Sequence, residues 1–288
     1  MKKQDFYLQG TEYDREMFHC DARLRFEWNI IYSCNFRCPY CFFEGKWENY
    51  GKRNVILPPD KWHDLWKEIY EKYDRCAIIV TGGEPFVYPD FIKIIRHVSE
   101  FHYPINISTN ASMDLNTVVG EIDPKRISLS LSFHPEYNSL QEIIDKSKYL
   151  VQNGFRRESI NMVAYPPYLS NLNEYVEQTI NNNESLKVIP FIGKYNGKEY
   201  PGAYTEVEKE LLGMNEKWEK NVKREGTLCA AGMKSVLIYP DGQVARCGQI
   251  GERVPLGNFI KREFKLLEGP LPCDVELCPC LETISVEE

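Results

Sequence analysis

The chain has 288 residues, 43% of them hydrophobic and 13% aromatic, and its formal net charge is −7. This composition can build a hydrophobic core and is unlike that of disordered chains. The negative charge argues against nucleic acid as the main partner, because phosphate binding needs a basic surface. The polar N-terminus and the lack of an apolar run near the ~20 residues of a membrane span predict a cytoplasmic protein without membrane contacts.

Segments with strand periodicity alternate with segments of helical periodicity over the first 222 residues. The strands are expected at 24–32, 76–81, 105–109, 127–133, 160–164 and 186–192. The helices are expected at 61–73, 90–102, 114–122, 139–154, 171–181 and 206–222. Ser139 and Glu142 have the spacing of a capping box at the start of the fourth helix. Right-handed connections between such units give a parallel sheet covered by helices.

Three cysteines, Cys34, Cys38 and Cys41, follow the first predicted strand with the spacing C-x3-C-x2-C. Three thiolates on one short loop can converge on one face of an iron–sulfur cube, which leaves one of its four irons open. A disulfide would leave an odd thiol, and a zinc site needs a fourth ligand, for which His63 is the nearest downstream candidate. The ten cysteines of the chain fit metal-bound thiolates in a reducing compartment better than disulfides in a secreted protein.

The second predicted strand is followed directly by Gly82-Gly83-Glu84-Pro85. A plain turn would also explain these glycines and the proline. Together with the cysteine loop, and in this order, the motif resembles the radical S-adenosylmethionine (radical SAM) enzymes over roughly residues 24–195. The resemblance implies an α/β fold, a partial (β/α)6 barrel, with its chemistry at the C-terminal ends of the strands.

The resemblance also implies the cofactors. Cys34, Cys38 and Cys41 would hold a [4Fe-4S] cluster, and the open iron would chelate the amine and carboxylate of SAM. One electron from a reductant such as flavodoxin or ferredoxin would then cleave SAM to a 5′-deoxyadenosyl radical, which removes a hydrogen atom from the substrate. Gly82 and Gly83 would let the backbone approach the methionine group, and Glu84 would engage its ammonium.

Further contacts to SAM are expected at the ends of the strands. Tyr40 occupies the aromatic position of the cysteine loop, where backbone groups meet adenine. Val163 and Ile189 would form an apolar shelf for adenine. The polar side chains that would contact ribose and carboxylate are Ser108, Asn110, Ser130 and Ser132. His134 is the catalytic candidate, as a substrate contact or an acid/base. Contact with water, or an ordinary place in the core, is the alternative for each of these side chains.

The C-terminal region has a different pattern. A β-hairpin is predicted from 236–239 and 243–245, with an Asp-Gly turn between them. Five cysteines surround it: Cys229, Cys247, Cys273, Cys278 and Cys280. The spacing from the first to the second of them, through Gly242, resembles the opening of the SPASM and twitch extensions of radical SAM enzymes. Five cysteines suit the twitch form, with one auxiliary [4Fe-4S] cluster, better than the seven of SPASM.

The cluster at this end would take Cys229, Cys247 and two of the three last cysteines, and the sequence leaves that pair open. A zinc ribbon is the alternative, because four cysteines also hold zinc. Cys20 and Cys76 are expected to be ordinary small residues. We therefore expect an N-terminal extension over 1–23, the barrel over 24–222 and a small C-terminal β-hairpin cluster domain over 223–288.

Two reactions fit this pattern. One is the oxidation of a small molecule, with the auxiliary cluster taking the second electron. The other is the modification of a ribosomally synthesised peptide, although such enzymes often carry an N-terminal recognition domain, for which two dozen residues are too few. A non-catalytic iron–sulfur carrier would not explain the open cluster or the Gly-Gly-Glu-Pro loop. The molybdopterin-type cyclases are related, but their C-terminal cysteine spacing and terminal glycines are not seen.

Overall fold

The computed structural model describes residues 22, 24–214, 223, 225–248, 254–276 and 278. Its centre is an eight-stranded sheet with the order β13-β12-β11-β10-β1-β2-β3-β4. The strands of this sheet are β1 (Arg25–Ile31), β2 (Ala77–Gly82), β3 (Ile105–Thr109), β4 (Ile127–Leu131), β10 (Ser235–Ile238), β11 (Gln243–Ala245), β12 (Pro255–Asn258) and β13 (Glu263–Phe264). Neighbours from β10 through β1 to β4 are parallel, as expected for right-handed βαβ units.

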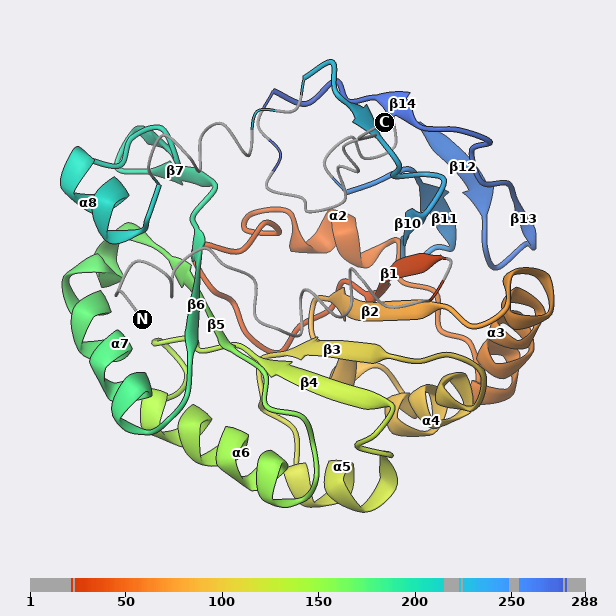
Figure 1. The fold of residues 1–288 in the computed structure, drawn as a ribbon, viewed down its shortest axis with the longest axis horizontal. Helices are drawn as coiled ribbons and strands as arrows, with labels where there is room; N and C mark the ends of the chain where they lie inside the picture. The colour runs from red at the N-terminus through yellow and green to blue at the C-terminus, as the bar shows by residue number, and fades with distance from the viewer. Residues whose placement is uncertain are drawn as a thin grey trace.

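The last two strands of the expected barrel pair with each other. β5 (Ile160–Ala164) and β6 (Leu186–Pro190) form a parallel pair, and a single bridge between Ser132 and Asn161 joins them to β4. All six predicted barrel strands are therefore present. Figure 1 shows them curving from β1 to β6, which confirms a partial α/β barrel.

Helices cover the outer side of these strands (Figure 1). They are α3 (Pro59–Tyr73), α4 (Phe91–Phe101), α5 (Leu115–Glu121), α6 (Leu140–Gln152) and α7 (Leu172–Asn181). Trp28 of β1 packs on Trp62 and Trp66 of α3, with ring centroids 4.8 and 5.1 Å apart. Because side chains alternate along a strand, the opposite face of the sheet carries the polar residues, among them Ser108 and Ser130.

Two helix predictions need correction. Ser139 accepts a hydrogen bond from the Glu142 N–H at 3.2 Å, but the Glu142 carboxylate pairs with Lys146 at 2.6 Å and leaves the capping box half formed. The last helix, α8, spans only Glu206–Leu211. Gly213, at φ +68°, ends it, and residues 215–222 of the expected helix lie outside the described part.

The predicted C-terminal hairpin is present as β10 and β11, and Gly242 has φ +80° in the turn between them. The sequence did not reveal that β10 would pair with β1, so that the hairpin continues the barrel sheet. Also unpredicted were α2 (Trp47–Gly51), the turns η2 (Pro85–Val87) and η3 (Pro166–Asn171), the hairpin of β7 (Gly193–Tyr195) and β8 (Lys198–Tyr200), the strands β12 and β13, and the pair of β9 (Leu228–Cys229) and β14 (Leu271–Pro272). Among the described residues, no helix is both long and apolar enough to cross a membrane.

Candidate active site

The loop after β1, residues 32–46, carries Cys34, Cys38 and Cys41 and is called the cluster loop below. Cys38 is buried and Cys34 and Cys41 are half-buried, all as free thiols. The Phe36 N–H donates to Sγ of Cys34 at 3.3 Å. Burial raises the pKa of each thiol, that of Cys38 to about 12. A bound metal must therefore displace the thiol protons when these groups become ligands.

The spacing of the thiols bears on the kind of metal centre they could hold. In the described ranges, no three His, Cys, Asp or Glu side chains converge closely enough to share one metal ion. An iron–sulfur cube takes each thiolate at a different iron, so its ligands need not meet at one point. A [4Fe-4S] cube at Cys34, Cys38 and Cys41 stays a prediction at this point.

The loop after β2 lies directly against the beginning of the cluster loop. The Gly83 N–H donates to the Ile31 carbonyl at 2.7 Å, and the Glu84 N–H donates to the Ser33 carbonyl at 3.0 Å. A Cβ on Gly82 would lie 2.1 Å from the Ile31 oxygen, and one on Gly83 would lie 2.1 Å from the Ser33 oxygen. Both positions require glycine because the two backbones touch. This reason differs from the expected approach to SAM, which stays a prediction.

Glu84 joins the second loop to the end of β3. Its side chain is 1% exposed, and its carboxylate accepts from the Thr109 hydroxyl at 2.8 Å, the Asn110 N–H at 2.7 Å and the Phe86 N–H at 3.1 Å. Desolvation raises the pKa of Glu84, and these hydrogen bonds oppose that rise. The expected contact with the SAM ammonium stays a prediction, and the structure adds a positioning role for the same carboxylate.

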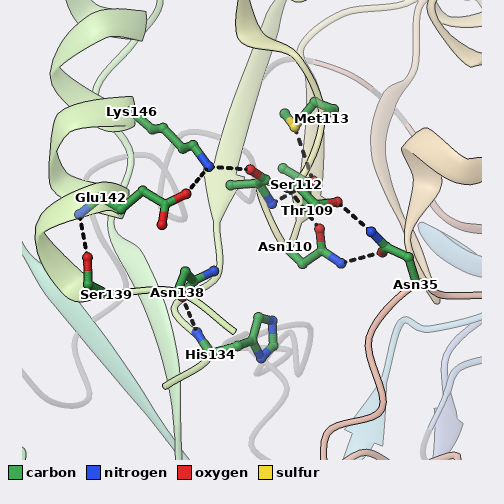
Figure 2. A network of polar contacts seen from close by, with 11 residues as sticks. Asn35, Thr109, Asn110, Ser112, Met113, His134, Asn138, Ser139, Glu142 and Lys146 are labelled. Atoms are coloured by element: carbon green, nitrogen blue, oxygen red, sulfur yellow. Dashed lines mark hydrogen bonds and ion pairs between the residues drawn. The ribbon is translucent and has the colours of Figure 1, made fainter. Parts of the chain in front are cut away.

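Asn110 connects β3 back to the cluster loop, as Figure 2 shows. Its Nδ2 donates to Oδ1 of Asn35 at 2.8 Å and lies 3.8 Å from Sγ of Cys34. Nδ2 of Asn35 in turn donates to the Ser112 hydroxyl at 2.8 Å. The expected contact of Asn110 with SAM stays a prediction, and the structure adds a hydrogen bond that orients the loop carrying the thiols. Hydrogen-bond partners of this kind orient metal ligands and adjust the metal.

His134 lies beside the buried thiol. Its Nδ1 is 3.4 Å from Sγ of Cys38 and 2.8 Å from the hydroxyl oxygen of Tyr40. The Tyr40 hydroxyl also donates to Glu136 at 3.2 Å, and Tyr168 donates to the other oxygen of the same carboxylate. Burial lowers the pKa of His134 to about 4, so the ring is neutral near pH 7. Tyr40 thus meets side chains of the barrel through its hydroxyl.

The remaining predicted SAM contacts share one face of the sheet. Ser108 of β3 is the register partner of Ser130 in β4, and Ser130 exchanges hydrogen bonds with Asn106. Val163 and Ile189 are register partners in β5 and β6, and Ile189 keeps 42% of its surface exposed. Ser132, just after β4, forms the bridge to Asn161 of β5. The polar and apolar candidates therefore occupy neighbouring strands, and their contacts with SAM stay predictions.

The C-terminal cysteines also come together. Cys229 and Cys273 are buried in one small cluster with Ala231, and Cys247 packs against it. The Ala231 N–H lies 3.5 Å from Sγ of Cys229 and donates to it. Cys278 is 5% exposed, whereas Cys280 and Cys20 lie outside the described residues. Cys76 is a buried core residue, in agreement with the prediction.

Four residues of these two sites were not identified from the sequence: Asn35, Thr109, Glu136 and Arg246. Asn35 lies inside the cysteine motif and Arg246 directly precedes Cys247, so adjacency to a cysteine was the available signal. Thr109 and Glu136 had no such signal, because only the packing of separate strands brings them to Glu84 and Tyr40.

Comparison with known proteins gives one family. Residues 28–169 match the model of the radical SAM superfamily. A GTP 3′,8-cyclase of Crocosphaera subtropica is 25% identical over 228 residues, which cover 69% of this chain and 67% of the cyclase. The solved structure of native anSMEcpe with bound AdoMet matches with a TM-score of 0.62 and 16% identity, covering 83% of this chain and 79% of that one.

Streptococcus suis SuiB bound to its precursor peptide SuiA has the same fold, with a TM-score of 0.59 and 14% identity over 88% of this chain and 67% of SuiB. The family match covers the cluster loop, the Gly-Gly-Glu-Pro loop and His134. The chain therefore carries a radical SAM domain over residues 28–169.

Proposed function

We propose that the chain reductively cleaves SAM at Cys34, Cys38 and Cys41 and removes a hydrogen atom from a substrate at the ends of β3 to β6. The observation that carries this proposal is the junction of the two loops. Gly83 and Glu84 are hydrogen-bonded to the residues just before Cys34, and Glu84 and Asn110 tie both loops to β3. The motif that would bind the methionine group thus lies beside the proposed thiolate ligands.

The cluster, when bound, supplies the electron that cleaves SAM and so yields the 5′-deoxyadenosyl radical. The chain's own residues hold and orient the reactants. Asn35 and Asn110 fix the cluster loop, and Tyr40, His134 and Glu136 form its other wall. Flavodoxin or ferredoxin in a reducing cytoplasm is the proposed source of the electron.

We propose small-molecule oxidation as the overall reaction. Removal of one substrate hydrogen leaves a radical, and a stable oxidised product forms only when a second electron is also lost. The grouping of Cys229, Cys247 and Cys273, with Cys278 buried nearby in the sequence, supports a second cluster that could accept this electron. A fully ligated cluster has no open iron to bind substrate. Electron transfer is therefore the role that we propose for it.

Peptide modification is the second candidate. The solved structures of similar fold include SuiB with its precursor peptide, and the exposed Ile189 and Ile192 at the end of β6 offer apolar surface to a larger substrate. GTP cyclisation is a third possibility, because curated relatives at about a quarter identity are GTP 3′,8-cyclases. The radical SAM domain argues against the non-catalytic carrier.

The test is reductive SAM cleavage followed by hydrogen transfer. Reconstituted protein with strong reductant and SAM should release 5′-deoxyadenosine and methionine, and Cys38→Ala should abolish this release. No 5′-deoxyadenosine from fully loaded protein would contradict the proposal.

Deuterium transfer then identifies the substrate class. Perdeuterated sugars and cyclitols, deuterated peptides and deuterated GTP are offered separately, and mass spectrometry finds which one passes deuterium to 5′-deoxyadenosine. Transfer from a sugar or cyclitol supports small-molecule oxidation, whereas transfer only from peptide or GTP selects the corresponding alternative.

A further inference from the structure

A buried positive charge lies among the C-terminal cysteine segments. Arg246 is 3% exposed and directly precedes Cys247. Its guanidinium donates hydrogen bonds to four main-chain carbonyls, at 3.1 Å in Ala231, 3.3 Å in Cys229, 2.9 Å in Pro272 and 2.5 Å in Leu271. The carbonyls belong to two segments, 229–231 and 271–272, and Arg246 itself belongs to a third. One planar side chain therefore links three segments.

Each of these three segments carries a thiol. The first contains Cys229, the second leads into Cys273 and the third continues into Cys247. The first two pair through β9 and β14, which are two residues each, and through main-chain hydrogen bonds of Gly226 and Thr227 with Cys273, at 2.7 and 2.8 Å. Such short strands fix their own register weakly. The guanidinium adds four hydrogen bonds to this short pairing and ties it to the segment that carries Cys247.

The charge of Arg246 has no carboxylate partner among the described residues. Its four acceptors are neutral carbonyls, whose dipoles offset only part of the charge. Burying an uncompensated cation is unfavourable, because the charge loses its hydration. The segments that the guanidinium joins carry three groups that can become anionic, the packed thiols of Cys229, Cys247 and Cys273. Binding of a metal centre converts them to thiolates and so provides the missing negative charge.

We propose that Arg246 is the positioning residue of the C-terminal metal centre, holding the three cysteine segments and receiving its counter-charge from their thiolates. The proposal rests on the proposed function in assuming that these thiols bind a metal cluster. Gly232 supports it, because a Cβ there would lie 2.6 Å from Leu267 and 3.0 Å from Cγ of Arg246. The glycine leaves room for the arginine stem.

The test compares three variants in protein whose Cys34, Cys38 and Cys41 are replaced by alanine, so that only the C-terminal centre remains. Arg246→Gln removes the charge and most donors, and Arg246→Lys keeps the charge without the planar fork. Arg262→Gln is the matched control, since Arg262 is a surface residue paired with Glu68 at 2.7 Å. Iron, sulfide and zinc are counted after anaerobic reconstitution, and the loss of metal to a chelator is timed.

We expect Arg246→Gln to weaken metal retention roughly 10- to 100-fold, the usual effect of removing a partner that orients metal ligands. Arg246→Lys should lie between this variant and the parent, and Arg262→Gln should match the parent. Arg246→Gln in protein that keeps Cys34, Cys38 and Cys41 should leave the N-terminal cube and SAM cleavage intact. That result would show that the barrel is folded in the variant.

Full metal content and an unchanged rate of loss in Arg246→Gln would overturn the positioning role. A parent protein that binds no metal at these thiols would overturn both the proposal and the auxiliary cluster. Zinc in place of iron would contradict only the auxiliary cluster, and faster loss of that zinc from Arg246→Gln would still support the role of Arg246.

Discussion

The hydroxyl oxygen of Tyr40 lies 2.8 Å from Nδ1 of His134, and the same nitrogen lies 3.4 Å from Sγ of Cys38. A thiolate bound to iron can only accept a hydrogen bond, so the tautomer of His134 with its proton on Nδ1 is the one that can donate to Cys38, and it shares that single N–H between the Cys38 sulfur and the Tyr40 oxygen. The Tyr40 hydroxyl then accepts from His134 and donates to Glu136, 3.2 Å away. The Glu136 carboxylate accepts from both Tyr40 and Tyr168, which leaves the Tyr40 oxygen free to accept from His134.

This geometry predicts an effect on the cluster potential. A hydrogen bond to a ligating thiolate stabilises the reduced, more negative cluster. We expect His134→Phe to lower the reduction potential of the N-terminal cube by on the order of tens of millivolts, and Tyr40→Phe to raise it slightly, because the ring N–H is then no longer shared with the tyrosine oxygen. Redox titration followed by electron paramagnetic resonance, in protein lacking the C-terminal thiols, measures the shift.

Tyr168→Phe is the control for these variants, because it leaves the bond between Tyr40 and Glu136 in place. Its potential should stay close to that of the parent. A potential that is unchanged or higher in His134→Phe would show that Nδ1 does not donate to the thiolate.

Glu84 should couple the stability of the fold to SAM binding. Glu84→Gln places an amide where three donors point, and an unsatisfied buried donor costs about 1–3 kcal/mol. We expect this variant to unfold at lower urea concentration and to bind SAM more weakly, while its iron content stays near that of the parent. Equilibrium dialysis with SAM and urea unfolding provide the two measurements.

Thr109→Val removes one of the three donors to Glu84 and should destabilise the protein less than Glu84→Gln. Because the two side chains share one hydrogen bond, Thr109→Val should have a smaller effect in the Glu84→Gln background. Additive effects would show that the hydroxyl and the carboxylate act independently.

The barrel was predictable because its signals are local. The apolar stripes of α3 and α4, and the alternation of serine and apolar residues in β4, follow from one face of each element being buried. The pairing of β10 with β1 joins residues about two hundred positions apart. The sequence of neither strand indicates which other strand it will pair with. The short strands β9, β12, β13 and β14 depend on such pairing and have too few residues to show a period.

The candidate site divides in the same way. The cysteine spacing and the two glycines were visible because the chemistry and the backbone contact each demand particular residues at fixed positions. The partners of Glu84 were not visible, because Thr109 and Asn110 reach it only after β2 and β3 pair. Arg246 was overlooked because a single arginine in a sequence is most often a surface residue.

His102 should make the stability of the fold depend on pH. Its ring is fully buried, with Nε2 2.8 Å from the Trp66 carbonyl and Nδ1 accepting from the Cys76 N–H at 3.1 Å. Burial lowers the pKa of His102 from 6.5 to about 4. The lowered pKa means that the neutral ring contributes stability above pH 6.5, and that this contribution is lost as the pH falls from 6.5 toward 4.

We expect the free energy of unfolding to fall by roughly 2 kcal/mol between pH 7 and pH 5 because of this group. Urea unfolding at both pH values measures the change. His102→Gln should be less stable at pH 7 but lose less on acidification, whereas His63→Gln, at a partly exposed position on α3, should keep the loss of the parent. An equal loss in His102→Gln would assign the pH dependence to other groups.

The C-terminal centre should be needed for product formation and dispensable for SAM cleavage. Cys229→Ala with Cys247→Ala removes two thiols of the packed group and leaves the cluster loop unchanged. If the second cluster accepts the second electron, this variant should still release 5′-deoxyadenosine but form little oxidised product from the substrate identified by deuterium transfer. Product and 5′-deoxyadenosine are measured together, so their ratio reports the step that is lost.

Loss of fold must be separated from loss of the electron acceptor, because β10 and β11 near these thiols belong to the barrel sheet and metal binding can stabilise a small unit. Hydrogen exchange supplies this control: amides of β1 and β10 should remain protected in the variant. A protected variant that lacks the C-terminal cluster and still gives full product would exclude the cluster as electron acceptor. The reaction would then require no net oxidation of the substrate, as in a radical rearrangement or cyclisation.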